Sequence, residues 1–562
     1  MKKSKTIFHF FTALLEKGLF VLFLLFLVFI ASIRVPVPEV DSKITPESYT
    51  REEVGKDHYR LDNSWLKKNE FGVWEMYLEG TPYERGVKYG VLAKEIVESQ
   101  EASFVNQLNE LIPNAFFQHF LRFTIAWMNR DMDEYIAKEN LAEIYGISKS
   151  FSDKYDYIGP KFYRILYYHA AHDIGHALAD LRIVGCTSFS AKGEYTTDGE
   201  LIIGRNFDFY MGDDFAKDKL LLFENPAKGY PFCSYSWAGF TGVVSGMNNQ
   251  GLTVTLNAAK SDVPFGAKEP ISLLAREILQ YAKNIEEAVA IAKKKETFVS
   301  ESLLIGSALD NKAVIIEKTP TKIDVFDNLL DNMVCANHYQ SQLYQSDEAN
   351  LSNIEMSDSK FRFNRMNELI AQEKPLDFNS SAKILRDRGG ENNQNIGLGN
   401  PRSINQLIAY HSIIFKPTSK QMWVSTYPYQ LGEYLCYDLN KVFNSSGNFS
   451  YEKEFTIEKD AFLNTSEYKS LALFRKQKEA IVKHVMFGKE LTLSTKDIDS
   501  FINSNPESYE TYFNIGRYFS SKGEQEKALK MYKNALQKAV ASKAEKIDIE
   551  NKIKELESNL KK

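Results

Sequence analysis

Cysteine is scarce in this chain, and its spacing excludes two classes of protein. The 562 residues contain only four cysteines, at positions 186, 233, 335 and 436, and no two of them are close together. Zinc ribbons and disulfide-dense secreted scaffolds both need clustered cysteines, so neither class fits. Each cysteine therefore has to be explained on its own.

An excess of charge of one sign is also missing. The chain has 69 basic and 74 acidic side chains, a formal net charge of -5 and a pI near 6.1. Nucleic-acid binding leaves a clustered basic face, and the lysine-rich stretches here are instead mixed with glutamate, so we expect no nucleic-acid partner. A hydrophobic content of 44% and an aromatic content of 13% exclude a disordered chain and predict more than one folded domain.

Long apolar runs are absent except at the N-terminus. Residues 18–33 read GLFVLFLLFLVFIASI without a charge, and Lys2, Lys3 and Lys5 precede them. A membrane span needs roughly 20 apolar residues, which the weaker apolar stretch before Glu16 helps to supply. Small residues suited to signal cleavage are poorly placed, which favours an uncleaved anchor. The basic N-terminal side then predicts that the body of the chain lies outside the cytoplasm, in a periplasmic or extracellular location.

The spacing of apolar residues changes several times along the chain, and this pattern predicts an α+β protein. Apolar residues at three- and four-residue spacing before Cys186 predict helices, and short β-branched or aromatic segments after it predict strands. Asp310 and Asn311 predict a hairpin turn, and residues 271–295 predict one long helix. The expected segments are an anchor (1–34), a linker (35–73), a helical pro-region (74–185), a catalytic domain (186–450), a connecting helical segment (451–505) and a helical repeat (506–562).

The C-terminal segment fits the template of a tetratricopeptide repeat. Aromatic, apolar and small residues recur at the template's positions. These positions are Tyr512, Ile515, Gly516, Phe519, Ala528, Tyr532 and Ala535, whereas Val540 replaces the usual closing proline. A single repeat cannot bury its own apolar face. We therefore expect this segment to dock on the rest of the chain or on a protein partner.

The Gly185–Cys186 pair permits self-cleavage. A thiol can attack the carbonyl of the residue before it, and the small Gly185 hinders that attack little. Hydrolysis of the resulting thioester leaves a new chain whose first residue is Cys186. The α-amino group of that residue has an ordinary pKa of about 7.7–8.0, which suits a general base at neutral pH. A buried structural cysteine is the alternative, and Gly-Cys alone does not exclude it.

The residues that follow resemble the cysteine branch of the N-terminal nucleophile (Ntn) hydrolases. That branch shares a Cys-Thr start, an Asp-Gly turn and a Gly-Arg-Asn-x-Asp strand, matched here at 186–187, 198–199 and 204–208. The branch includes choloylglycine hydrolases and penicillin V acylases. The resemblance is greatest to the acyl-coenzyme A:6-aminopenicillanate acyltransferase-like proteins, whose pro-region motif is similar to EGTPYERGVKYG at 79–90. It covers about residues 75–440 and implies a four-layer αββα sandwich.

The resemblance also implies the site residues. It makes Cys186 the nucleophile after cleavage between Gly185 and Cys186, with no cofactor and no metal. The other catalytic residues it implies are Arg205, Asp208, Asn257 and Asn337, and the substrate-binding residue is Arg362. Arg205 is expected to favour the thiolate, Asp208 to hold the freed amine, and Asn257 to bind the oxyanion. The implied reaction is hydrolysis of, or acyl transfer from, a small-molecule acyl amide or acyl thioester, at a linear C–N bond other than a peptide bond.

Two other functions stay open at this point. His169, His172 and His176 lie at helical spacing and permit a metal hydrolase, although the His-Glu-x-x-His pattern of metalloproteases is absent. A catalytically inactive scaffold, tethered to a membrane and binding a partner through the C-terminal repeat, is the other alternative. An intact Cys186, Arg205 and Asp208 argue against the scaffold, which needs none of them.

Overall fold

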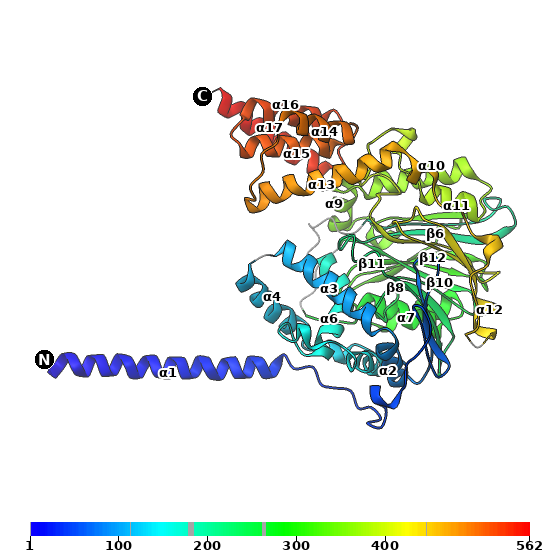
Figure 1. Cartoon of the computed structure of the whole chain (residues 1–562), viewed down its shortest axis with the longest axis horizontal. Helices are drawn as coiled ribbons and strands as arrows, with labels where there is room; N and C mark the ends of the chain where they lie inside the picture. The colour runs from blue at the N-terminus through cyan, green and yellow to red at the C-terminus, as the bar shows by residue number, and fades with distance from the viewer. Residues whose placement is uncertain (1, 113, 178–184, 261–265, 446, 562) are drawn as a thin grey trace.

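Two β-sheets form the centre of the molecule. The computed structural model describes residues 2–112, 114–177, 185–260, 266–445 and 447–561, and Figure 1 shows the sheets side by side with helices around them. The larger sheet has the order β1 (Glu52–Gly55), β2 (His58–Leu61), β3 (Ser64–Lys68), β4 (Trp74–Gly80), β7 (Lys219–Pro226), β8 (Phe232–Trp237), β9 (Ser245–Asn248), β10 (Leu252–Ala258), β11 (Glu301–Ser307), β12 (Lys312–Lys318), β13 (Ile323–Phe326). The smaller sheet has the order β14 (Asn332–Cys335), β5 (Thr187–Gly193), β6 (Gly199–Asp208), β15 (Ala409–Lys416), β16 (Gln421–Ser425), β17 (Tyr434–Asp438).

Apolar side chains from both sheets meet in a shared core. Ile203 of β6 and Ile413 of β15 pack there with Phe223 of β7 and Ile315 of β12. The neighbouring residue of β6, Ile202, points to the opposite side and joins a core with helices. This alternation follows from the two-residue period of a strand. It buries both faces of the smaller sheet.

Helices cover the outer face of each sheet and complete four layers. The helices on the outer side of the larger sheet are α2 (Pro82–Leu92), α3 (Lys94–Leu111), α5 (Lys138–Ser148), α6 (Lys161–Ala177), α7 (Ile271–Tyr281), α8 (Ile285–Lys294). Those packed on the smaller sheet are α10 (Ser359–Glu373) and α11 (Phe378–Leu385), with α9 (Glu348–Met356) beside α10. A short α12 (Leu439–Asn444) follows β17. The observed layering is the helix–sheet–sheet–helix arrangement that the resemblance implies.

The N-terminal part of the chain contains more strand than the sequence predicts. Strands β1 to β3 lie within the predicted linker, and β4 opens the predicted helical region. β4 pairs in parallel with β7, which follows Cys186 in the chain. These strands have only four to seven residues, and parallel pairing depends on a distant segment, so local periodicity did not reveal them. The segment before Gly185 is thus part of the larger sheet.

One predicted helix is divided, while a predicted hairpin is confirmed. The single helix expected over 271–295 is two helices, α7 and α8, because Asn284 starts α8 by accepting a hydrogen bond from the backbone N–H of Glu287. Asparagine is a preferred N-cap residue, so it ends one helix and begins the next. β11 and β12 form the predicted hairpin, with Asn311 in the left-handed region at a φ of 45°.

The chain begins with α1 (Lys2–Ser32), which extends away from the body in Figure 1. Its last turns contact α4 (Ala115–Met128), where Phe26 and Phe29 pack on Phe123 at ring-centroid distances of 6.5 and 6.1 Å. The membrane span predicted near residues 18–33 is not found. No helix among the described residues combines the length and the hydropathy that a bilayer crossing requires.

Five helices form the C-terminal end of the molecule, shown in orange and red in Figure 1. They are α13 (Ser466–Phe487), α14 (Thr495–Ser504), α15 (Tyr509–Ser521), α16 (Gln525–Leu536) and α17 (Lys543–Leu560). α15 and α16 form a hairpin in which Gly516 lies against Tyr532, so that a Cβ at Gly516 would be 2.7 Å from the ring. Six of the seven template positions are buried there, and Tyr512 is partly buried. This region also shares its core with Leu407 and Leu431, which lie shortly before β15 and β17.

Candidate active site

Cys186 lies immediately before β5, at the edge of the core on the helical side of the larger sheet. Its side chain is buried, with 1% exposure, and packs in the cluster that includes Phe207 and Val244. β5 pairs with β6 so that Ser188 faces Arg205, which brings the guanidinium to the cysteine. Arg205 Nη2 lies 3.6 Å from Cys186 Sγ. The predicted nucleophile and its predicted cation are therefore neighbours.

The thiol is nevertheless protonated in the intact chain. Burial raises the pKa of Cys186 to about 11, although the nearby Arg205 lowers it. The charge of Arg205 favours the thiolate, but desolvation of the charged form outweighs this effect. A thiol in this state is a weak nucleophile until a base takes its proton.

Arg205 also connects the two sheets. It extends from β6 to the larger sheet, where Nη1 donates to Val244 O at 2.7 Å and to the hydroxyl of Ser245. Nη2 also donates to the carbonyl of Leu256. These contacts fix the planar guanidinium in one orientation beside the thiol. Ser245 in turn contacts His411 Nε2 at 2.9 Å, which places that buried histidine behind Arg205.

Asp208 lies at the end of β6, next to the predicted cleavage site. The Gly185 N–H donates to the Asp208 carbonyl at 3.1 Å. Burial raises the pKa of the Asp208 carboxyl to about 7, against the lowering effect of Arg362 and Arg205. Among the residues that the structure describes, the buried Oδ1 has no hydrogen-bond partner. This carboxyl is thus close to its titration point at neutral pH and has one oxygen free to accept a donor.

Arg362 of α10 joins several of the predicted residues. Its Nη1 donates to Cys186 O and to Thr187 Oγ1, each at 2.7 Å, and its Nη2 donates to Asn337 Oδ1 at 2.7 Å. Asp358, one turn earlier on α10, pairs with the same guanidinium at 3.0 Å. The sequence assigned Arg362 only to substrate binding. The structure places it on the backbone carbonyl of Cys186, the predicted nucleophile.

The two predicted asparagines lie on neighbouring segments, each bonded to the backbone beside the other. Asn257 of β10 accepts a hydrogen bond from Ser188 Oγ at 2.8 Å and donates from Nδ2 to Cys335 O at 3.1 Å. Asn337, which follows β14, donates from Nδ2 to Ala258 O at 2.8 Å. Both amides are thus hydrogen-bonded to backbone in the intact chain. Of the other five predicted site residues, Arg205 and Arg362 contact Cys186 directly, and Asn337 contacts Arg362. Asp208 contacts Gly185, and Asn257 contacts Ser188 of β5.

Gln406, which belongs to none of the predicted motifs, contacts the predicted cleavage site. Gln406 Nε2 donates to the carbonyl oxygen of Gly185 at 2.8 Å and lies 3.5 Å from Asp208 Oδ2. A Cβ at position 185 would be 2.5 Å from that same nitrogen, so a larger residue there would displace the Gln406 amide. Gln406 belongs to the loop before β15, which carries no recognised motif. Only the folded structure shows that Gln406 contacts Gly185.

The alternative metal site has little support in the described residues. His169 Nδ1 contacts Ile165 O at 2.8 Å, and Nε2 accepts from the Thr241 N–H at 2.9 Å, so both ring nitrogens are in use. The side chains of His172 and His176 lie outside the described residues. No group of three or more metal-binding side chains is found in the rest of the chain that is described.

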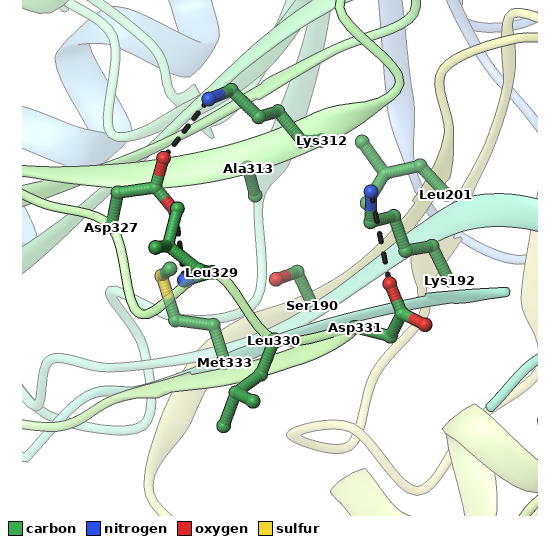
Figure 2. A pocket seen from close by; sticks show the side chains of 10 residues that line it. All are labelled: Ser190, Lys192, Leu201, Lys312, Ala313, Asp327, Leu329, Leu330, Asp331 and Met333. Carbon is green, nitrogen blue, oxygen red and sulfur yellow. Dashed lines mark hydrogen bonds and ion pairs between the residues drawn. The ribbon is translucent and has the colours of Figure 1, made fainter. Parts of the chain in front are cut away.

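A cavity elsewhere in the molecule is distinct from this site. Figure 2 shows it at the end of β5 that lies away from Cys186, with a volume of about 160 Å³. Two ion pairs border it, Lys312 with Asp327 at 2.9 Å and Lys192 with Asp331 at 3.8 Å. None of the predicted site residues lines it. It therefore contributes nothing to the chemistry at Cys186.

Comparison with known proteins relates this chain to acyltransferases and amidases. An uncharacterized protein of Archaeoglobus fulgidus is 28% identical over 251 residues, 42% of this chain and 41% of that protein. An N-acylethanolamine-hydrolyzing acid amidase of Caenorhabditis elegans is 26% identical over 203 residues, 34% of this chain and 54% of that protein. The matched regions thus span about half the length of these relatives.

Solved structures of similar proteins were also found. The C. elegans amidase ortholog covers 42% of this chain and 93% of its own, at 19% identity and a TM-score of 0.30. A conjugated bile acid hydrolase from Clostridium perfringens covers 48% and 96%, at 15% identity and a TM-score of 0.33. At the level of sequence, residues 195–426, which include every predicted site residue after Cys186, match the family described as acyl-coenzyme A:6-aminopenicillanic acid acyl-transferase.

Proposed function

We propose that this protein is a self-cleaving Ntn amidohydrolase or acyltransferase whose nucleophile is Cys186. The observation that carries the proposal is the set of contacts on the Gly185–Cys186 peptide. Arg205 lies at the thiol, Arg362 holds the Cys186 carbonyl, and Gln406 and Asp208 hold Gly185. A buried structural cysteine needs none of these polar contacts. The family match supports the same chemistry.

The proposed self-cleavage proceeds in two balanced steps. The Cys186 sulfur attacks the Gly185 carbonyl carbon, the C–N bond breaks, and the thiol proton passes to the departing Cys186 nitrogen. Water then hydrolyses the thioester, giving the Gly185 carboxylate and a free Cys186 thiol with a free α-amino group. Asp208 Oδ1, which has no hydrogen-bond partner among the described residues, is available to accept a hydrogen bond from that amine.

The mature reaction follows the same pattern on an external substrate. The Cys186 thiol attacks an acyl carbonyl while its own amine takes the proton and passes it to the leaving group. Asn257 stabilises the oxyanion, Asn337 and Arg362 position the substrate, and the acyl group passes to water or to an amine. The amidase named among the relatives supports a linear amide C–N bond as the target. An acyl thioester is the second substrate class.

Electrophoresis and mass measurement of the purified full-length protein test the proposal. Wild type is expected to give two fragments whose masses place the break between Gly185 and Cys186, whereas Cys186→Ala remains one chain. Cys436→Ala removes another buried free cysteine and is expected to cleave like wild type. A wild-type chain that stays intact and does not react with acyl-amide probes would overturn the proposal and favour an inactive scaffold.

Two further parts of the proposal concern the ends of the chain. The location of the catalytic part outside the cytoplasm rests on Lys2, Lys3 and Lys5 before the apolar run. We assign the α15–α16 hairpin to the tetratricopeptide type because Gly516 and Tyr532 pack at the positions expected of that repeat. Its apolar face is buried against α13 and the catalytic part, which supports docking within the chain.

A further inference from the structure

Gln406 lies where negative charge would develop during self-cleavage. When the Cys186 sulfur adds to the Gly185 carbonyl carbon, the carbonyl oxygen becomes an oxyanion. The Gln406 side-chain amide donates to that oxygen at 2.8 Å and is itself buried, with 4% exposure. A donor fixed in a buried site stabilises an oxyanion far more than water does, because its dipole is already oriented. The position of this amide fits that role.

The loop that carries Gln406 is held from two sides. We call residues 397–407 the bridging loop. On the catalytic side, Asn206 Nδ2 of β6 donates to Ile404 O at 2.9 Å, which fixes the loop beside the strand of Arg205 and Asp208. Leu407, directly after Gln406, adopts a φ of 58°, so the chain turns sharply there. The orientation of the Gln406 amide thus depends on this loop conformation.

The C-terminal helices hold the other side of the bridging loop. Asn505 exchanges two hydrogen bonds with the backbone of Leu398, at 3.1 and 2.9 Å. Arg475 of α13 donates to the carbonyl of Leu407, the residue next to Gln406, and its guanidinium also contacts Tyr429. A Cβ at Gly397 would be 2.4 Å from the backbone nitrogen of Ser508, so loop and helices are in close contact.

Two more contacts extend this interface. Asn400 Nδ2 donates to Ala539 O at 2.8 Å, and Arg402 Nε donates to Ala541 O at 3.0 Å. The carbonyl groups of residues 539 and 541 follow α16, so the end of the helical hairpin also fixes the loop. The helical region is therefore attached to the segment that touches the scissile peptide.

We propose that Gln406 is a catalytic residue of self-cleavage, stabilising the oxyanion at Gly185, and that the C-terminal helical region holds it in place. This inference rests on the proposed function. Arg475 is then a positioning residue, since it acts through the Leu407 carbonyl. Without the helical region, the bridging loop would be held only from the side of β6. The helical region therefore has a role in self-cleavage.

The rate of cleavage of newly synthesised full-length chain tests the role of Gln406. Gln406→Leu is expected to slow cleavage by about 10²–10³-fold, the effect of removing one oxyanion donor. Gln430→Leu is the matched control, because Gln430 is a buried glutamine whose side chain has no hydrogen-bond partner in the described residues. It is expected to cleave at the wild-type rate. Equal rates for Gln406→Leu and wild type would overturn the inference.

Gln406→Glu separates catalysis from packing. Its carboxyl has the shape of the amide, but when ionised it cannot donate and it repels the oxyanion. Asp208 faces this position and disfavours ionisation, whereas Arg205 and Arg362 favour it. Relative to wild type, cleavage by Gln406→Glu is expected to recover as the pH falls and the carboxyl becomes a donor. Gln406→Leu, by contrast, stays slow at every pH. Absence of this recovery would count against oxyanion stabilisation.

Arg475→Gln tests the positioning role of the helices. Cleavage is expected to slow by about 10- to 100-fold, because a displacement of about 1 Å can cost about 100-fold in rate. Lys476→Gln removes the same charge from the adjacent, exposed position of α13 and is expected to have no effect. Equal rates for the two variants would refute the positioning role. If wild type does not cleave, the proposed function is wrong. If wild type cleaves and the variants cleave at the same rate, only the further inference is wrong.

Discussion

A buried network of two arginines and two glutamates links the segments on either side of the predicted cleavage site. Glu143 of α5 binds Arg85 of α2 at 2.6 Å and Arg276 of α7 at 2.8 Å. Glu224 of β7 binds the same two arginines, with Arg85 Nε at 2.9 Å. All four side chains are almost completely buried. Burial opposes ionisation of Glu143, but Arg276 and Arg85 hold its pKa below the ordinary value, so it is charged.

Glu143→Gln removes one charge from this network and leaves a net positive charge in the core. Removing one partner of a buried ion pair costs about 3–5 kcal/mol, because the remaining charge is left uncompensated. Glu95→Gln is the matched control. Glu95 pairs with Arg51 at the same distance of 2.6 Å, but its side chain is 66% exposed. An exposed pair contributes about 0–1 kcal/mol, so this control removes the same type of charge from an exposed ion pair.

Urea denaturation of both variants in the Cys186→Ala chain measures this difference without interference from cleavage. We expect the free energy of unfolding to fall by about 3–5 kcal/mol for Glu143→Gln and by less than about 1 kcal/mol for Glu95→Gln. In the cleaved protein, the Glu143 variant is also expected to release its first fragment at a lower urea concentration. Equal losses for the two variants would refute the reasoning, since burial would then have no effect.

Three other predictions follow from the site and the helices. Arg362→Lys replaces a fork with a single donor group, so it should cost about 1–3 kcal/mol of unfolding free energy and slow cleavage, as measured by denaturation and electrophoresis. Because the pKa of Asp208 is raised to about 7 in the folded chain, its stabilising contribution is complete below about pH 4. That contribution is lost at about 1.4 kcal/mol per pH unit as the pH rises to about 7. The Asp208→Asn chain, compared by denaturation across this range, should lack that decline, and identical pH profiles would contradict it. Gly516→Leu forces a side chain into the Tyr532 ring and should destabilise the helical region by about 1–3 kcal/mol, whereas Lys533→Ala, at an exposed site, should not change its thermal unfolding.

The sequence predicted the parts of the fold that are encoded locally. Strand patterns after Cys186, the turn at Asp310 and Asn311, and the C-terminal helical hairpin all depend on residues near one another in the chain. Strands β1 to β3 were missed because each has only four or five residues. Strand β4 was missed because it pairs in parallel with β7, more than 130 residues away in sequence. A contact of that range leaves no periodic signal in the segment itself. The division of the 271–295 helix was missed because a single N-cap residue, Asn284, decides it.

In the candidate site, too, the residues of a sequence motif were predicted, whereas residues that come together only in the folded chain were not. Cys186, Arg205 and Asp208 were identified because they lie in one recognisable block, with Cys186 directly before β5 and the other two on β6. Arg362 was placed at the substrate, although it reaches the nucleophile's own carbonyl. Gln406 was missed entirely, since its loop is irregular and its orientation depends on helices that follow by 60 residues or more. Residues that act through tertiary contacts alone cannot be read from spacing.

The geometry also explains why the nucleophile would be inactive before cleavage and active after it. In the intact chain, burial holds the thiol protonated, with a pKa of about 11, and the Cys186 nitrogen is an amide without basic character. The proposed cleavage would convert that amide into an amine with an ordinary pKa of about 7.7–8.0, beside a carboxyl whose pKa is about 7. The amine then supplies the base that the thiol lacks. Breaking this one peptide bond would thus free the Cys186 residue and give its thiol a proton acceptor. A chain that cannot cleave should therefore also be unable to turn over substrate.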